Sequence, residues 1–197
     1  ETLDIVSLGH RRYEVRRFFV GKNQVGCARN RRKIMFREMR RKKQQLSTKE
    51  CVEILRKRTS GVLAVFGEDG YPYAVPISYV YEDGKIYFHS AKAGHKIDAI
   101  QQNSKVSFCI IDQDQVVPEK YTSYFRSVIV FGKVRILEDD QEKYKSIEQL
   151  AVKYAPDDRE EERKKAIEQE WNAFCMLELT IEHMTGKEAK ELAKKNC

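Results

Sequence analysis

The chain has 197 residues and a formal net charge of +7, with 34% charged and 41% hydrophobic residues. This length suits one domain with a full core plus extensions, since two domains would both be small. The longest apolar run is far too short for a membrane span, so we expect nothing in the chain to cross a bilayer.

The positive charge is concentrated at the front of the chain. Residues 1–34 hold nine lysines and arginines against three acidic residues, and residues 37–43 add a further net +4. The slightly acidic remainder argues against a globular nucleic-acid-binding surface. We predict that residues 1–34 are a basic leader, disordered or not native to the protein, with Met35 as a natural start and residues 35–197 as the folded domain. The alternative is a leader that contacts RNA or acidic lipid.

Five cysteines occur with no CxxC pair and no spacing typical of a metal site. An odd number without a signal peptide argues against a disulfide framework. We therefore expect a reduced, cytoplasmic protein without a structural metal.

The first part of the domain shows clear helix and strand patterns. Ser47 followed by Glu50 is a capping box, which predicts a helix to Arg58. Alternating apolar residues and turn glycines then predict a meander of three antiparallel strands. These strands cover residues 61–66, 73–81 and 85–89, and a short helix follows at about 94–102.

The second part predicts strands at residues 106–111 and 127–137, with a bulge or bend at Gly132. The segment between them, residues 112–124, is predicted to be a long aromatic loop that acts as a lid or a dimer contact. A helix is expected to about Tyr154, followed by a charged helical stretch to Glu170 with a solvated face. A last strand at 171–183 and a terminal helix opening at Gly186 complete the chain. Six antiparallel strands with few helices predict a small closed or split barrel.

The junction after the third strand is suited to a phosphate. His89 and Ser90 end the strand, and Lys96 lies in the first turn of the helix. The first N–H groups of a helix lack partners within it and favour an anion. The alternative is that Ser90 only caps the turn while His95 and Lys96 are solvated.

Several motifs in this order resemble one known family. They occupy residues 69–78, 86–91, 94–96, 116–120 and 127–132. Together they resemble the nitroimidazole-resistance branch of the pyridoxamine-phosphate-oxidase-related flavoproteins, over roughly residues 35–190. The resemblance implies a mainly β fold, a six-stranded antiparallel FMN-binding split barrel with flanking helices. It also implies a homodimer that holds each FMN in a cleft between the subunits.

The same resemblance implies the site residues. The strand Val75, Pro76, Ile77 and Ser78 would lie beside the flavin ring, and Ser127 near the same cleft. His89, Ser90 and Lys96 would surround the phosphate end. His89 would also be the catalytic residue, able to donate a hydrogen bond or a proton. The alternative for His89 is an ordinary half-buried histidine.

The function implied is an FMN-dependent oxidoreductase that passes electrons to a small planar acceptor, such as a nitroimidazole-type compound. The C-terminal residues lack the Arg–His constellation of the family's oxidase members, which argues against pyridoxamine-phosphate oxidation. The alternative function is a non-catalytic flavin- or haem-binding sensor. His89, His95 and His183 are the conceivable axial haem ligands.

Overall fold

The computed structural model describes residues 36–68 and 70–193. The predicted leader, residues 1–34, lies outside the described residues. The elements in chain order are η1 Lys42–Gln44, β1 Gln45–Leu46, α1 Thr48–Lys57, β2 Ser60–Phe66, β3 Pro72–Ser78, β4 Val80–Glu82, β5 Lys85–Ala91, α2 His95–Gln102, β6 Lys105–Val117, η2 Pro118–Lys120, β7 Thr122–Ile136, α3 Asp140–Tyr154, α4 Glu160–Glu170, β8 Phe174–Glu188 and α5 Lys190–Ala193.

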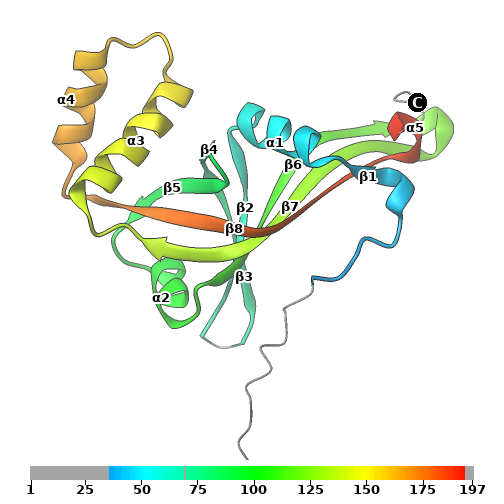
Figure 1. Ribbon diagram of the computed structural model, residues 1–197, viewed down its shortest axis with the longest axis horizontal. Helices are drawn as coiled ribbons and strands as arrows, with labels where there is room; N and C mark the ends of the chain where they lie inside the picture. The colour runs from blue at the N-terminus through cyan, green and yellow to red at the C-terminus, as the bar shows by residue number, and fades with distance from the viewer. Residues whose placement is uncertain (1–35, 69, 194–197) are drawn as a thin grey trace, which may run out of the picture. The chain divides into compact units, whose positions relative to one another are not determined.

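The strands form one antiparallel sheet in the order β3-β2-β6-β7-β8-β5-β4, and β1 pairs with β8. The two end strands, β3 and β4, follow each other in the chain and are separated only at Tyr79. The sheet therefore curls until its ends meet without pairing, which makes a split barrel (Figure 1). The predicted mainly β split-barrel fold is confirmed. Six strands have seven or more residues, and β1 and β4 add two short ones.

The core fills the inside of the curled sheet. Alternation along β5 buries Ile86 and Phe88, and Phe108 of β6 lies edge-on to Phe88 with 5.1 Å between ring centroids. Helix α1 covers one opening and buries Cys51, Ile54 and Leu55. The predicted capping box begins this helix: the Ser47 side chain accepts a hydrogen bond from the Glu50 N–H, and Glu50 accepts one from the Ser47 N–H at 2.7 Å.

Gly132 marks the predicted irregularity in β7. The β7–β8 register shifts between Phe131 and Gly132. A Cβ at Gly132 would lie 2.1 Å from the backbone oxygen of Thr180 and 2.8 Å from Leu179 Cδ1. Only a glycine fits here, because the backbone of β8 passes directly beside it.

The predicted loop at residues 112–124 is wrong. Strand β6 continues to Val117 and β7 begins at Thr122, so the segment is a long hairpin with a short turn. We call residues 112–127 the arm. Beyond Asp112, β6 pairs only with β7 among the described strands. This part of β6 does not lie on the core, so its sequence lacks the alternation of apolar and polar residues that predicts a strand. Ion pairs hold its base: Arg58 Nε lies 2.7 Å from Asp112 Oδ1, and Arg126 Nη2 lies 2.7 Å from Glu188 Oε2.

Two other boundaries differ from the predictions. The strand expected at residues 73–81 breaks at Tyr79, where the N–H of Tyr79 bonds the backbone oxygen of Thr59. The terminal helix begins at Lys190 rather than Gly186, because β8 continues to Glu188. Gly186 belongs to the strand because it pairs with Val128 of β7 and Leu46 of β1. Helix α1 packs on it closely, since a Cβ there would lie 2.5 Å from Cys51 Sγ.

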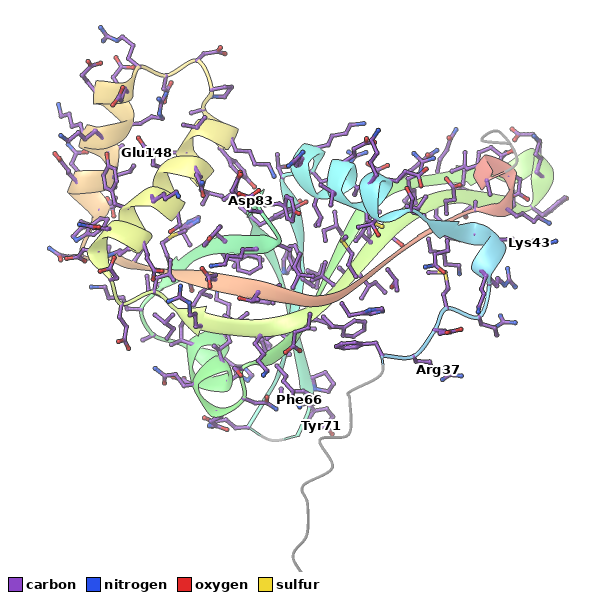
Figure 2. The ribbon with its side chains drawn as sticks, in the orientation of Figure 1. Arg37, Lys43, Phe66, Tyr71, Asp83 and Glu148 are labelled. Atoms are coloured by element: carbon purple, nitrogen blue, oxygen red, sulfur yellow. The ribbon has the colours of Figure 1, made fainter. Side chains whose placement is uncertain are left out.

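Helices α3 and α4 form a hairpin beside β5 and the start of β8 (Figure 1). Asp139 caps α3 by accepting hydrogen bonds from the N–H groups of Gln141 and Glu142. A second, smaller core lies under this hairpin and contains Leu137, Phe174 and Met176, with Tyr87, Ile147 and Trp171 packed against it. In Figure 2, Glu148 marks α3 and Asp83 marks the β4–β5 turn beside it. None of the helices described here has the length and hydropathy that a membrane crossing requires.

Candidate functional site

The end of β5 and the start of α2 carry three predicted residues, His89, Ser90 and Lys96, of which only His89 and Lys96 influence each other. Ser90 faces the barrel interior and is buried, whereas His89 faces the opposite side of the sheet. After Ala91 the chain turns to Gly94, which has a φ of 120° that glycine adopts readily. Gly94 is the N-cap residue of α2 and has no side chain that could bond the first N–H groups. The first N–H groups of α2 are therefore left without a capping side chain.

Lys96 lies in this first turn and is half-buried. Burial lowers the pKa of Lys96 from its ordinary value. Within residues 36–68 and 70–193 it has no ion pair with a carboxylate, unlike Lys85 or Arg126, which are paired. A partly desolvated cation without a protein counter-charge is suited to an anionic ligand.

His89 is accessible as a residue, yet its imidazole is partly desolvated. This desolvation lowers the pKa of His89, and the positive charge of nearby Lys96 lowers it further. At neutral pH the ring is therefore uncharged and offers one N–H donor and one acceptor nitrogen. His89 and Lys96 are close enough to influence each other, as the predicted phosphate end requires.

Strand β3 is an end strand of the sheet and carries four predicted residues. Val75 and Ile77 pack partly against the core, while Pro76 is exposed on the other face. Pro76 has no N–H and is tolerated because β3 pairs on one side only, with Val62 of β2 opposite it. Ser78 ends the strand. The open side of β3 leaves backbone groups available for a ligand.

Ser78 and His89 line the same pocket, which has a volume of about 430 Å³. It lies between the sheet and the α3–α4 hairpin. The pocket is mainly apolar, and its other lining residues are Ile147, Leu150, Ala151, Tyr154, Ala155, Asp158, Arg163, Ala166, Ile167, Glu170 and Phe174. The sequence analysis missed the contribution of both helices. One feature of the sequence could have indicated that α4 packs against the rest of the domain: Ala166 and Ile167 are the two apolar residues of this otherwise polar helix.

Ser127 is not near this group within one chain. It pairs with Ile111 and Lys187, whereas the β7 residue in the same row as Phe88 is Ile136. Ser127 lies nine residues before Ile136 along β7, which corresponds to about 30 Å at the usual rise per residue of a strand. A role for Ser127 in the cleft stays a prediction, and it would require the Ser127 of a second copy.

The three histidines considered as haem ligands do not converge. His95 stacks on Tyr73 with ring centroids 4.2 Å apart, and His183 stacks on Phe36 at 4.6 Å. His89 pairs with Met176 in β8, seven residues along the strand from His183. The described residues also contain no cluster of three or more histidine, cysteine or acidic side chains able to hold a metal ion.

Solved structures with the same fold include flavoproteins. A protein from Bacteroides thetaiotaomicron provisionally assigned to 5-nitroimidazole antibiotic resistance has 22% identity and a TM-score of 0.61, covering 73% of this chain and 86% of its own. An FAD-binding protein from Mesorhizobium loti has 27% identity and a TM-score of 0.52, covering 74% and 96%. An FAD- and haem-binding protein from Mycobacterium smegmatis has 19% identity and a TM-score of 0.62, covering 75% and 73%. No curated protein sequence matches the chain.

The fold and the open strand β3 define a split barrel of the kind found in these structures. The family model described as pyridoxamine 5'-phosphate oxidase matches residues 47–188. The chain therefore belongs to the pyridoxamine 5'-phosphate oxidase family, as its motifs indicated.

Proposed function

We propose that the chain is an FMN-dependent oxidoreductase that passes electrons from a reduced donor to a small planar acceptor, with nitroimidazole-type compounds as the example. The observation that carries the proposal is Lys96, a half-buried cation without a carboxylate partner in the described chain, at the start of α2 and beside His89. Membership of a family whose structural relatives include flavin-binding proteins supports it.

The residues present fit a phosphorylated flavin. Lys96 and the first N–H groups of α2 would hold the phosphate, whereas Ser90 would need to turn from the barrel interior to take part. The open edge of β3, residues 75–78, would offer backbone N–H and C=O groups to the polar edge of the ring while Val75 and Ile77 keep the strand against the core. FMN, when bound, supplies the electron-transfer chemistry.

His89 is the residue that we propose for catalysis. Its neutral imidazole can hold a proton on one ring nitrogen and donate it as a hydrogen bond toward the negative charge that develops during reduction. The pocket beside it is mainly apolar, so a ligand that filled it would displace water from that hydrogen bond and strengthen it.

We also propose a homodimer with the cofactor between the subunits. The arm and its base expose large apolar residues to an unusual degree: Ile111 is 58% exposed, Val116 70% and Tyr121 99%. Such a surface favours association with a second copy. A partner could also bring its Ser127 to the cleft, which one chain alone does not do. The cysteines Cys51, Cys109 and Cys175 are free thiols, which supports the proposed cytoplasmic location.

The first experiment is an absorption spectrum of the purified chain, before and after incubation with FMN. We expect a bound flavin spectrum, and we expect Lys96→Met to weaken FMN binding by about 10- to 100-fold, as for the loss of a charged hydrogen bond. Lys105→Met removes the same charge from an exposed site at the start of β6 and serves as the matched control. A chain that neither contains nor gains flavin would refute the proposal, as would equal affinity in both variants.

The second candidate is a non-catalytic binder of flavin or haem. It is favoured by the relative that binds both FAD and haem. The two functions differ in their half-reactions: an enzyme is reduced by nicotinamide nucleotides and then reoxidised by a nitroaromatic compound, whereas a binder undergoes neither step at a useful rate. Stopped-flow absorption measures both.

A further inference from the structure

The pocket under the α3–α4 hairpin contains groups that the flavin proposal does not use. We propose that it binds an uncharged ring compound that carries a carbonyl or nitro oxygen, as the second substrate. This inference rests on the proposed function and gives it a defined substrate class. The flavin would lie along the open edge of β3 and at the start of α2, and the two sites would meet at Ser78 and His89.

The lining of the pocket favours an apolar ligand body. Leu150 and Ile167 come from the two helices and Phe174 from β8, and all three side chains are buried. A volume of about 430 Å³ falls in the range of pockets that take small organic ligands. A ring compound placed here would cover apolar surface that the pocket now leaves open to water.

Arg163 supplies the evidence for an acceptor oxygen. Its Nε atom is buried and makes no hydrogen bond within the described chain, although a terminal guanidinium nitrogen bonds the backbone oxygen of Asp158. A buried donor without a partner costs free energy, which a ligand acceptor would recover. Because Arg163 lines the pocket, a carbonyl or nitro oxygen is suited to this donor.

The charges around the pocket favour a neutral ligand. Arg163 is the single lysine or arginine of the lining, and Asp158 and Glu170 add two carboxylates. His89 adds no charge at neutral pH, because desolvation and Lys96 lower its pKa. An anionic ligand would meet two negative side chains for one positive side chain. A cation without an acceptor atom would leave the Arg163 Nε–H without a partner. A neutral acceptor avoids both costs.

Isothermal titration calorimetry of the full chain tests the inference with 1,4-naphthoquinone and its anionic 2-sulfonate. We expect the neutral quinone to bind at least tenfold more tightly than the sulfonate. Arg163→Met should weaken quinone binding about tenfold or more, since it removes the donor and keeps an apolar stem. Lys164→Met removes the same charge from the neighbouring, exposed position of α4 and should leave the affinity unchanged.

Flavin content and circular dichroism are measured on every variant, so that failure of the pocket can be separated from failure of the proposed function. Normal flavin content without quinone binding, or equal affinity of the two ligands, would overturn the inference alone. Equal losses in the Arg163 and Lys164 variants would also overturn it. Quinone binding that depends on Arg163 in a chain without flavin would support the pocket and refute the flavoprotein. If Arg163→Met fails to fold, Ala151→Trp fills the pocket from α3 and should abolish quinone binding.

Discussion

Replacing Gly132 by alanine should destabilise the barrel through a contact between two strand backbones. The added Cβ would lie 2.1 Å from the backbone oxygen of Thr180, whereas ordinary contacts begin near 3.4 Å. Strands β7 and β8 would therefore have to separate by more than 1 Å at this point. Overpacking of this kind costs about 1–3 kcal/mol, and a weakened ladder hydrogen bond adds about 1 kcal/mol. We expect a loss of about 3 kcal/mol in the free energy of unfolding.

Urea denaturation measures this loss through Trp171, the single tryptophan of the chain, which precedes β8. A loss of this size lowers the melting temperature by about 6–12 °C in a protein of this length. Gly84→Ala is the comparison: its φ of 80° is strained for alanine, but an added Cβ meets open space, so we expect about 1 kcal/mol. If Gly132→Ala cost no more than Gly84→Ala, the close approach of β7 and β8 would not be the cause.

Three further predictions concern single residues. Ser47→Ala removes the cap of α1 and should cost about 1 kcal/mol in urea denaturation, and no loss would show that the cap contributes nothing. Burial lowers the pKa of Lys153 to about 8 in the folded chain. Between pH 8 and the ordinary lysine pKa, the unfolded chain therefore binds more protons than the folded chain, and the free energy of unfolding should rise with pH. Lys153→Met should abolish that rise, and an unchanged slope would contradict it. Replacing the almost fully buried Glu178 by alanine removes the carboxylate that pairs with Lys85 and Arg135, while Arg135 keeps Glu142 as a second partner. Because both cations are nearly half exposed, we expect a loss of about 1.5–3 kcal/mol, whereas a loss below about 1 kcal/mol would show that solvent screens them.

Local signals in the sequence predicted the barrel well. Ser47 and Glu50 are three residues apart and bond each other's backbone, so the start of α1 depends on no distant contact. Strands β2 and β5 alternate because one face of each lies on the core. Gly132 could be recognised because a glycine within an apolar strand has few other causes than a close backbone approach.

The arm and the apolar pocket could not be predicted, because both depend on contacts between distant segments. Residues 112–117 form a strand through pairing with β7 and through the Arg58–Asp112 ion pair, which joins residues far apart in the chain. The pocket arises where α4 folds back on α3, so that Arg163 and His89 line the same space. A charged helix such as α4 shows in its sequence which residues are polar, and only the packing shows which of them lose contact with water.

The pairing of β1 with β8 has a consequence for how the chain folds. Gln45 lies opposite Lys187 and Leu46 opposite Gly186, so the first described strand pairs with the last one. During synthesis on the ribosome, β1 and the part of the apolar face of α1 that packs on β8 must wait for almost the whole domain before they can dock. Such long sequence separation slows folding and leaves that face available to chaperones until β8 emerges.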